Sequence, residues 1–423
     1  MSDTSEHIVI VGAGAAGLMA ARELARAGRK VTILEARQRC GGRIHPLPVS
    51  EFGYPADGGA EFVHGEAPVT RALLREAALS LQEIEGEQWS FDGTKLSRED
   101  RLDPHEAELQ AVLGDLKDDL TVADFLRRHF SGDEYASMRH SIERMVEGYD
   151  AADPERASTL ALRAEWMDGG HAPQARIDGG YGAMIDVLAA DCRRHGVTIR
   201  LGCVVSAIAE EGGAVAVRCA GGDVHACDRV ILTVPLPLLR EIALPAGARA
   251  KLAAADDIGF GNVIKIVLRF ARPWWRERKE DLADMTFLLS DQAIPVWWTQ
   301  YPSQHAVLTG WFGGPRTMEL ESLDPQGLIE AGLGSLAAVF SLPRDDIARQ
   351  LVAGAAANWA HDRFARGAYS WATPRTREAQ AILSRAGGRV LFSGEALYRG
   401  RDMGTVEAAL ASGLETAGMI LQG

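Results

Sequence analysis

A single lysine stands inside an apolar run, and its ammonium is the group in this sequence best suited to chemistry in a buried site. Residues 263–267 read Val-Ile-Lys-Ile-Val, and Lys265 is one of only six lysines in the chain. In a β-strand, alternation places Lys265 on the same face as Val263 and Val267. A buried ammonium must extend to solvent or bind a polar partner. The run therefore predicts either an edge-strand lysine or a fixed positive charge within a functional site.

The residues near the N-terminus predict a phosphate-binding turn. Gly12, Gly14 and Gly17 follow the apolar run 8–11 with the spacing G-x-G-x-x-G. The first glycine permits a tight turn, the second lets the backbone approach a pyrophosphate, and the third lets helix and strand pack closely. We expect a strand at 8–11 and a helix at about 15–27, with its positive N-terminal end facing the phosphates.

An acidic residue follows the second strand of this unit. Residues 31–34 read Val-Thr-Ile-Leu, and Glu35 stands at their end. A carboxylate at this place accepts hydrogen bonds from ribose hydroxyls and disfavours a 2′-phosphate, which favours NAD or FAD. Gly42 and Arg43 then belong to a second glycine turn, which offers backbone donors and a guanidinium to the same pyrophosphate. An ordinary polar turn explains this second motif equally well.

Composition and charge define the broad class of protein. The chain has 423 residues, of which 47% are hydrophobic and 24% charged, so it is long enough for two domains. The formal net charge of −13 argues against nucleic acid as a partner. No stretch approaches the roughly 20 apolar residues of a membrane span, and the first residues carry no secretory pattern. We expect a cytoplasmic protein without a membrane partner. Whether it forms a homodimer is left open by the sequence.

The cysteines favour reduced thiols. Their number is odd and no two form a C-x-x-C pair, which also offers no zinc site. The five cysteines are Cys40, Cys192, Cys203, Cys219 and Cys227.

The rest of the chain alternates between helical and strand-rich stretches. Residues 97–153 are polar and acidic with helical periodicity, which predicts a helical insertion. Its acidic residues could steer a cationic substrate, but a solvated helix face explains them more simply. Downstream we expect a helix at 179–195, strands at 197–201, 204–208, 214–218 and 229–234 with hairpin-like pairing, a strand-rich section from 259, and a last strand at 390–392.

Motifs along nearly the whole chain resemble those of the FAD-dependent amine oxidase family, which includes monoamine oxidases, polyamine oxidases and the flavin lysine demethylases. The resemblance starts with the glycine fingerprint and the turn at 41–43. It continues through the segments 57–65, 177–189, 230–239, 261–270, 358–371, 391–396 and 404–418. Each motif is modest evidence, whereas all of them in this order are specific.

The resemblance implies an α/β fold with a discontinuous, Rossmann-like FAD-binding domain and a second, α+β substrate-binding domain. We expect the first domain to combine residues 1–75, 176–260 and 385–423. The second domain would combine residues 76–175 and 261–384.

The resemblance also assigns residues to FAD. Glu395 matches a residue that binds the ribityl-pyrophosphate part, and the amides near Val406 would face the flavin carbonyl at a helix N-terminus. Small residues later in this helix allow close approach to a ring, but packing against a neighbouring backbone explains them more simply. The residues expected to bind FAD are Gly12, Gly14, Ala15, Ala16, Gly17, Glu35, Ala36, Arg37, Gly42, Arg43, Gly59, Ala60, Glu61, Phe62, Val205, Trp359, Gly394, Glu395, Gly404, Thr405, Val406 and Ala409.

Five residues are expected to act on the substrate: Lys265, Tyr369, Trp359, His64 and Thr405. At the matching position of the family, a lysine reaches a water close to flavin N5. Trp359 is expected near the flavin ring and Tyr369 as one wall of the substrate site, where it would shield a cation and orient the C–H bond. His64 matches a histidine of polyamine-oxidising members. Taken without the resemblance, the two aromatic residues would be core residues and His64 a structural histidine.

The sequence departs from the family in several places. Monoamine oxidases carry a second aromatic residue where this chain has Thr405, which argues against a full two-aromatic cage. Ala368 stands where they carry the cysteine linked to flavin, so we expect dissociable FAD. The long insertion of the demethylases is missing, and residues 59–65 contain no arginine that would hold a carboxylate. These differences disfavour a histone or an amino acid as the substrate.

We therefore predict an FAD-dependent enzyme that oxidises a small amine, with hydride transfer to the flavin, hydrolysis of the imine, and O2 as the electron acceptor giving hydrogen peroxide. No metal is expected. The alternatives are a related flavin oxidase or dehydrogenase acting on an amino acid or a non-amine substrate, a nicotinamide-binding reductase, and a flavin-binding protein without turnover.

Overall fold

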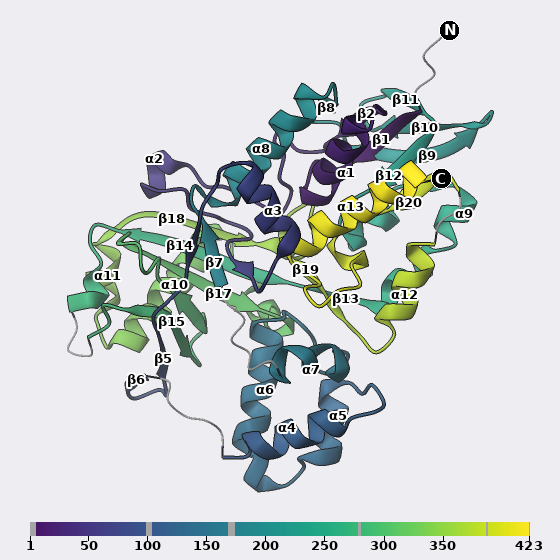
Figure 1. Cartoon of the computed structure of the whole chain (residues 1–423). Helices are drawn as coiled ribbons and strands as arrows, with labels where there is room; N and C mark the ends of the chain where they lie inside the picture. The colour runs from purple at the N-terminus through teal and green to yellow at the C-terminus, as the bar shows by residue number, and fades with distance from the viewer. Residues whose placement is uncertain (1–5, 99–103, 168–173, 278–280, 386–387, 423) are drawn as a thin grey trace.

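A computed structural model describes residues 6–98, 104–167, 174–277, 281–385 and 388–422 (Figure 1). One of its two large sheets has five parallel strands in the order β20-β12-β1-β2-β8. These strands are β1 (His7–Val11), β2 (Lys30–Leu34), β8 (Thr198–Arg200), β12 (Arg229–Leu232) and β20 (Val390–Phe392). The predicted α/β class and the strand-turn-helix start of the chain are thus confirmed.

Helices cover one face of this sheet. The buried side chains of Ile8 and Ile10 pack against α1 (Ala15–Arg26), α8 (Gly180–Arg194) and α13 (Val406–Gln422). Close packing requires glycine at two places. A Cβ on Gly17 would lie 2.1 Å from the Gly12 carbonyl oxygen, and one on Gly413 would lie 2.3 Å from the Ala16 carbonyl oxygen. The small residues of α13 therefore let this helix lie directly on α1, as the simpler interpretation of them predicts.

A three-stranded antiparallel sheet covers the other face, against Val9 and Val11. It consists of β9 (Val205–Glu211), β10 (Ala214–Cys219) and β11 (Val224–Cys227). The hairpin-like pairing predicted for this part of the chain is confirmed.

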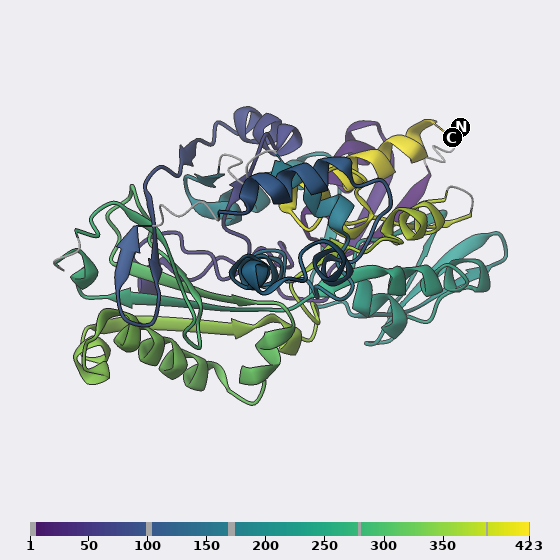
Figure 2. The same ribbon diagram turned by 90° about the horizontal axis from the view of Figure 1, so that it is seen from below.

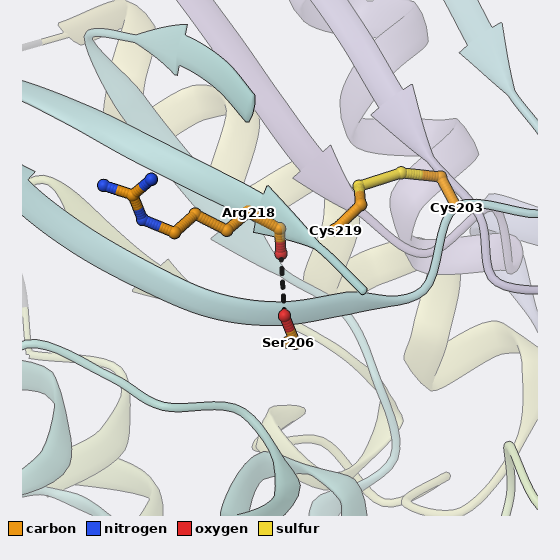
Figure 3. The surroundings of a disulfide bond; sticks show 4 residues. All are labelled: Cys203, Ser206, Arg218 and Cys219. Carbon is orange, nitrogen blue, oxygen red and sulfur yellow. Dashed lines mark hydrogen bonds between the residues drawn. A yellow bond between two sulfur atoms is a disulfide. The ribbon is translucent and has the colours of Figure 1, made fainter. Parts of the chain in front are cut away.

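The prediction that all cysteines are reduced is wrong. Cys203 and Cys219 form a disulfide, with their Cα atoms 5.9 Å apart, at the end of β10 (Figure 3). Register explains the pair, because Cys219 lies opposite Val205, two residues beyond Cys203. His225 lies beside both sulfur atoms. The spacing of 16 residues is not a C-x-x-C motif, so only the strand pairing could have revealed it.

The second large sheet has seven strands in the order β18-β14-β17-β16-β15-β5-β6. Its strands are β5 (Glu87–Phe91), β6 (Leu96–Arg98), β14 (Val263–Phe270), β15 (Met285–Ser290), β16 (Val296–Trp298), β17 (Val307–Gly313) and β18 (Leu351–Asn358). The helix α10 (Pro325–Phe340) lies against one face (Figure 2). Its Leu333 and Leu336 pack against Ile264 and Ile266. Lys265 belongs to the opposite face, because side chains alternate along a strand.

Helices gather at one end of the molecule, below the second sheet in Figure 1. They are α4 (Glu106–Asp115), α5 (Val122–His129), α6 (Ala136–Gly148) and α7 (Thr159–Met167). The first three confirm the helical insertion predicted at 97–153, whereas α7 lies beyond its predicted end and β6 covers residues 97 and 98 at its start. Residues 99–103 lie outside the described residues. Two small antiparallel sheets complete the strands: β13 (Ile258–Gly261) with β19 (Tyr369–Ala372), and β3 (Val63–His64) with β7 (Gln174–Ile177) and β4 (Leu81–Glu83). The remaining α-helices are α2 (Val49–Phe52), α3 (Pro68–Glu76), α9 (Ala246–Arg249), α11 (Arg344–Ala348) and α12 (Thr376–Leu383).

The two large sheets draw their strands from the two predicted sets of segments. The domain boundaries themselves stay a proposal. Over the described part of the chain, no helix combines the length and the apolar character that crossing a bilayer requires.

The disulfide should stabilise the fold by closing a short loop. Closing a loop of about 15 residues contributes about 3 kcal/mol in the chain-entropy treatment. We therefore expect a thiol reductant to lower the free energy of unfolding of the wild-type protein by up to that amount, as measured by urea denaturation. The Cys203→Ser variant should already have the lower value and should not respond to the reductant. An equal response of both proteins would show that the disulfide is absent.

Candidate active site

Lys265 lies on a central strand rather than at an edge. The strand β14 pairs with β17 on one side and with β18 on the other, and Lys265 lies opposite Trp311 and Ala357. The Lys265 side chain is only 1% exposed. The interpretation as an edge-strand lysine is therefore wrong, and the ammonium has to find its partners inside the protein.

Glu61 is the main partner of this ammonium. Its Oε2 accepts a hydrogen bond from Lys265 Nζ at 2.8 Å, and its Oε1 accepts one from Arg176 Nε at 2.9 Å. Trp298 Nε1 and Gln300 Nε2 also donate to Oε1, each at 3.0 Å. The carboxylate is thus buried with four donors, two of them cationic. We call Glu61, Lys265, Arg176, Trp298 and Gln300 the charge cluster.

The two cations keep Glu61 ionised. Burial alone would raise the pKa of Glu61, but the charges of Lys265 and Arg176 outweigh burial and lower the pKa to about 2. The sequence predicts only a cofactor contact for Glu61. Because the carboxylate is committed to the cluster, any such contact is left to the backbone of this segment.

Asp57 is a second buried carboxyl group beside the cluster. Its Oδ2 accepts a long hydrogen bond of 3.4 Å from the Tyr181 amide, and its Oδ1 has no partner among the described residues. Burial raises the pKa of Asp57 to about 7, although the charge of Lys265 lowers it and that of Glu61 raises it further. Asp57 is therefore largely protonated in mildly acidic solution.

Aromatic side chains share the face of the sheet that carries Lys265. Strand register places Trp311 opposite Lys265, and Trp298 and Phe287 follow on the next two strands. The ring of Phe62 lies 5.3 Å from that of Trp298, and the ring of Trp311 lies 5.8 Å from that of Trp298. Tyr369 stacks on Trp311 at 6.3 Å. We call Phe62, Phe287, Trp298, Trp311 and Tyr369 the aromatic wall.

Trp359 lies next to Tyr369, at the end of the aromatic wall. Trp359, which is 5% exposed, packs with Val263 and Ala368 in a small core cluster that Tyr369 and Trp311 border. The Tyr369 hydroxyl donates to the carbonyl oxygen of Tyr149 at 2.6 Å. The structure therefore brings Lys265, Trp359 and Tyr369 together, although they are up to 104 positions apart in the sequence.

His64 lies at the border of the aromatic wall, with its ring 6.1 Å from that of Phe62. Its Nδ1 lies 3.2 Å from the Tyr149 hydroxyl. Burial lowers the pKa of His64 to about 4. The imidazole is therefore neutral near pH 7 and adds no charge at the border of the wall.

Thr405 has a local structural role. Its hydroxyl donates to the Asp402 carbonyl oxygen at 2.6 Å and accepts from the Ala408 amide at 3.2 Å, so it caps α13. A Cβ on the preceding Gly404 would lie 3.3 Å from Tyr369 Cδ2. The start of α13 thus lies against Tyr369, but the Thr405 side chain is engaged by its own helix.

The residues predicted to bind the adenosine end of a cofactor lie together. Glu35 is buried at the end of β2, where its carboxylate accepts hydrogen bonds from the amides of Ala13 at 2.7 Å and Arg37 at 2.8 Å. A carboxylate has about four lone-pair sites, so two stay available for ribose hydroxyls. The Glu35 carbonyl oxygen also accepts a hydrogen bond from the Cys203 amide at 2.8 Å. This bond brings Val205, at the start of β9, close to the end of β2.

The two glycine turns form a cradle with room above it. Gly14 pairs with Gly41 as an isolated bridge, and the Gly41 amide donates to the Ala13 carbonyl oxygen at 2.9 Å. A Cβ on Gly14 would meet no atom nearer than the Gly41 carbonyl oxygen, at 4.0 Å. Glycine is therefore not needed there for packing within the chain, and the free space above the backbone fits the pyrophosphate of a dinucleotide.

The far end of the chain joins the same site. Arg43 Nη1 donates to Glu395 Oε1 at 2.8 Å and to the Ala368 carbonyl oxygen at 2.7 Å. Arg43, Gly394 and Glu395 line one pocket together with residues 232–236. The donors, acceptors and glycines present thus fit FAD or NAD.

The remaining predicted cofactor residues lie in four places of the same region. They are Ala15, Ala16 and Gly17 in the first turn of α1, Ala36 after Glu35, Gly42, Gly59, Ala60 and Phe62 around the second turn, and Val406 and Ala409 at the start of α13.

Sequence reasoning missed several members of the site. Arg176, Trp298 and Trp311 are not predicted, and neither is Glu407, whose buried carboxylate accepts from the Val69 and Thr70 amides at 2.9 and 2.7 Å. A signal was available for Trp298, because the pair Trp297-Trp298 in a strand must send one ring to each face. The partners of Glu61 depend on strand register, which no local pattern reveals.

The fold and the site define a dinucleotide-binding protein in which a second sheet presents a buried lysine and an aromatic wall. The chain belongs to the family described as flavin containing amine oxidoreductases, which matches residues 15–421. The recognition made from the motifs is thus confirmed.

Relatives of several kinds resemble the chain. Polyamine oxidase 2 of Arabidopsis thaliana is 27% identical over 65% of this chain and 61% of its own length. Lysine-specific histone demethylase 2 of Homo sapiens is 26% identical over 98% of this chain and 53% of its own length. The chain therefore spans about half to three fifths of the curated relatives that it matches.

Solved structures share the fold. A putrescine oxidase bound to putrescine and the cyclohexylamine oxidase from Brevibacterium oxydans IH-35A both align with a TM-score of 0.81, at 20% identity, over 99% of each chain.

The buried carboxyl of Asp57 should make the stability depend on pH. Its pKa is about 7 in the fold against 3.8 as the ordinary value, so the native protein holds one more proton between these pH values. The free energy of unfolding therefore falls as pH rises through this window, by about 1.4 kcal/mol per pH unit at most. The Asp57→Asn variant should lose this dependence, so that its stability relative to wild type increases from pH 4.5 to about pH 7 and then levels off.

Urea denaturation across this pH range measures the effect. The Asp345→Asn variant, which removes a carboxyl that is 80% exposed, is the matched control. A constant difference between Asp57→Asn and wild type at all pH values would contradict the prediction.

Proposed function

We propose that this protein is an FAD-dependent amine oxidase. The observation that carries the proposal is the shared face of the second sheet. Lys265, Trp311, Trp298 and Phe287 lie on this face. Lys265 donates to Gly59 and Glu61, and Trp298 contacts Phe62. The Gly59 backbone in turn packs against the Arg43 carbonyl oxygen in the second glycine turn. This arrangement supports a small-molecule site where the dinucleotide cradle meets an aromatic surface.

In the proposed reaction, an amine loses a hydride from the carbon next to its nitrogen, and water hydrolyses the resulting imine. When bound, FAD supplies the acceptor for the hydride and passes the electrons to O2, which gives hydrogen peroxide. Because Ala368 offers no thiol for a covalent link, we propose that FAD binds non-covalently.

The chain's own residues prepare the amine for this reaction. Only a neutral amine has the lone pair that assists loss of hydride, and a nearby positive charge lowers the pKa of an ammonium. While Asp57 is protonated, Lys265, Arg176 and Glu61 together leave one net positive charge beside the wall. The aromatic rings exclude water and can orient the apolar part of the substrate.

The substrate we propose is a monoamine with a bulky apolar group. A polyamine needs an anionic group for its second ammonium. Glu61, the carboxylate that is hydrogen-bonded to the wall at Trp298, is already neutralised by two cations. Arg176 lies close to the Phe62 ring, at 4.8 Å, but it is bound to Glu61 and is not free to hold the carboxylate of an amino acid.

Purified protein tests the proposal directly. A visible flavin spectrum that is bleached without oxygen by apolar monoamines, and restored by air with release of peroxide, is the expected result. Bleaching by amino acids alone would favour a related oxidase. A flavin spectrum that no substrate bleaches would favour a flavin-binding protein without turnover, and protein that cannot be reconstituted with FAD would refute the proposal.

The Lys265→Met variant should retain FAD but lose much of its reaction with substrate or with O2. Methionine fills the same volume without the charge, so the fold is expected to persist. Stopped-flow absorbance of the bound flavin measures the two half-reactions separately, and a loss of at least 10-fold in one of them is expected. Lys30→Met, at the exposed start of β2, is the matched control. Unchanged rates in Lys265→Met would show that this lysine is only structural.

A further inference from the structure

Among the described residues, the hydrogen bonds of Lys265 leave one N–H of its ammonium without an acceptor, and the ammonium lies 5.3 Å from the centroid of the Trp298 ring. The ammonium has three N–H donors. One donates to Glu61 Oε2 at 2.8 Å and another to the Gly59 carbonyl oxygen at 2.9 Å. Both acceptors come from the same short segment, so the third N–H has a fixed direction relative to residues 59–61.

Glu61 is itself held rigidly. Its Oε1 accepts three hydrogen bonds, so the carboxylate cannot rotate without breaking them. The anchor is Arg176, whose other nitrogens donate to the carbonyl oxygens of Thr299 at 3.0 Å and Tyr301 at 3.3 Å. The Arg176 guanidinium also lies over the ring of Phe62. A network of this kind fixes a geometry more strongly than a single ion pair does.

We propose that Glu61, anchored by Arg176, is a positioning residue that holds the Lys265 ammonium for the reaction. This inference rests on the proposed function. Neither the glycine fingerprint nor the lysine strand assigns this role, because it arises only when β7, β14 and residues 59–61 come together.

The proposal differs from two simpler roles. If Glu61 acted on a bound cofactor through its own charge, its effect would not depend on Lys265. If it served only the stability of the fold, its loss would destabilise the protein without a specific effect on the lysine. A positioning role instead requires that the contribution of Lys265 disappears when Glu61 is replaced.

A double-mutant cycle tests this requirement. The variants are Glu61→Gln, Lys265→Met and the combination of both, each as the FAD-loaded protein. Two quantities are measured: the rate of flavin reduction by an amine that bleaches the wild-type protein, and the midpoint potential of the bound flavin without substrate. The second measurement requires no turnover.

The expected result is strong coupling between the two positions. Glu61→Gln should slow flavin reduction by up to about 100-fold, the effect of a misplacement of roughly 1 Å, but by no more than Lys265→Met does, because it acts only through that lysine. The double variant should be no slower than Lys265→Met. Lys265→Met should lower the midpoint potential of the otherwise wild-type protein, because a nearby cation stabilises the reduced flavin. In the Glu61→Gln background, the same substitution should lower the potential by less, because the ammonium is no longer held in the same place.

Additive effects on both quantities would overturn the proposal while leaving the proposed function intact. Failure to bind FAD in the wild-type protein would overturn both. The Asp191→Asn variant, which removes a carboxylate that is 4% exposed and bound to Arg22 and Arg26 in the second half of α1, controls for the loss of a buried ion pair.

A second variant covers the case in which Glu61→Gln does not fold. Glu61→Asp keeps the charge but withdraws the carboxylate by one methylene. It should slow flavin reduction less than Lys265→Met does, and the loss should again vanish in combination with Lys265→Met. An effect of Glu61→Asp that persists in that combination would also overturn the proposal.

Discussion

The buried ammonium of Lys265 is the constraint on which the arrangement of this site depends. A charge in the interior of a sheet is tolerated only with a counter-charge and with hydrogen bonds, and removal of one partner typically costs about 3–5 kcal/mol. Glu61 and Gly59 satisfy this requirement from a segment that precedes Lys265 by more than 200 residues. The second sheet is therefore tied to residues 59–61 at the point where it presents its aromatic wall.

The same segment is tied to the parallel sheet. A Cβ on Gly59 would lie 1.8 Å from the Arg43 carbonyl oxygen, so these two backbones touch. Arg43 in turn binds Glu395 at 2.8 Å, next to the last strand of the parallel sheet. One continuous set of contacts thus runs from the lysine to the glycine cradle and on to the C-terminal part of the chain. The charge cluster and the cradle are thus in contact through packed backbone and ion pairs.

Local patterns were sufficient where the chemistry is local. The G-x-G-x-x-G turn, the acidic Glu35 and the apolar run around Lys265 could all be recognised, because each depends on neighbours within a few residues. The partners of Lys265 could not be recognised, since they depend on how β7, β14 and residues 59–61 are arranged in space. The Cys203–Cys219 disulfide and the raised pKa of Asp57 were missed for the same reason, because pairing and burial over long distances create both.

The aromatic wall supplies an aromatic neighbour for Tyr369 although position 405 holds a threonine. The sequence lacks the second aromatic residue that monoamine oxidases carry at that position, and the Thr405 hydroxyl is used to cap α13. Tyr369 nevertheless has an aromatic neighbour, because Trp311 stacks on it with an interplanar angle of 19°. Trp311 is also the cross-strand neighbour of Lys265, so the residue that supports the tyrosine flanks the lysine as well. The second sheet, rather than the start of α13, therefore supplies the aromatic surface, and its register fixes that surface and the ammonium in the same step.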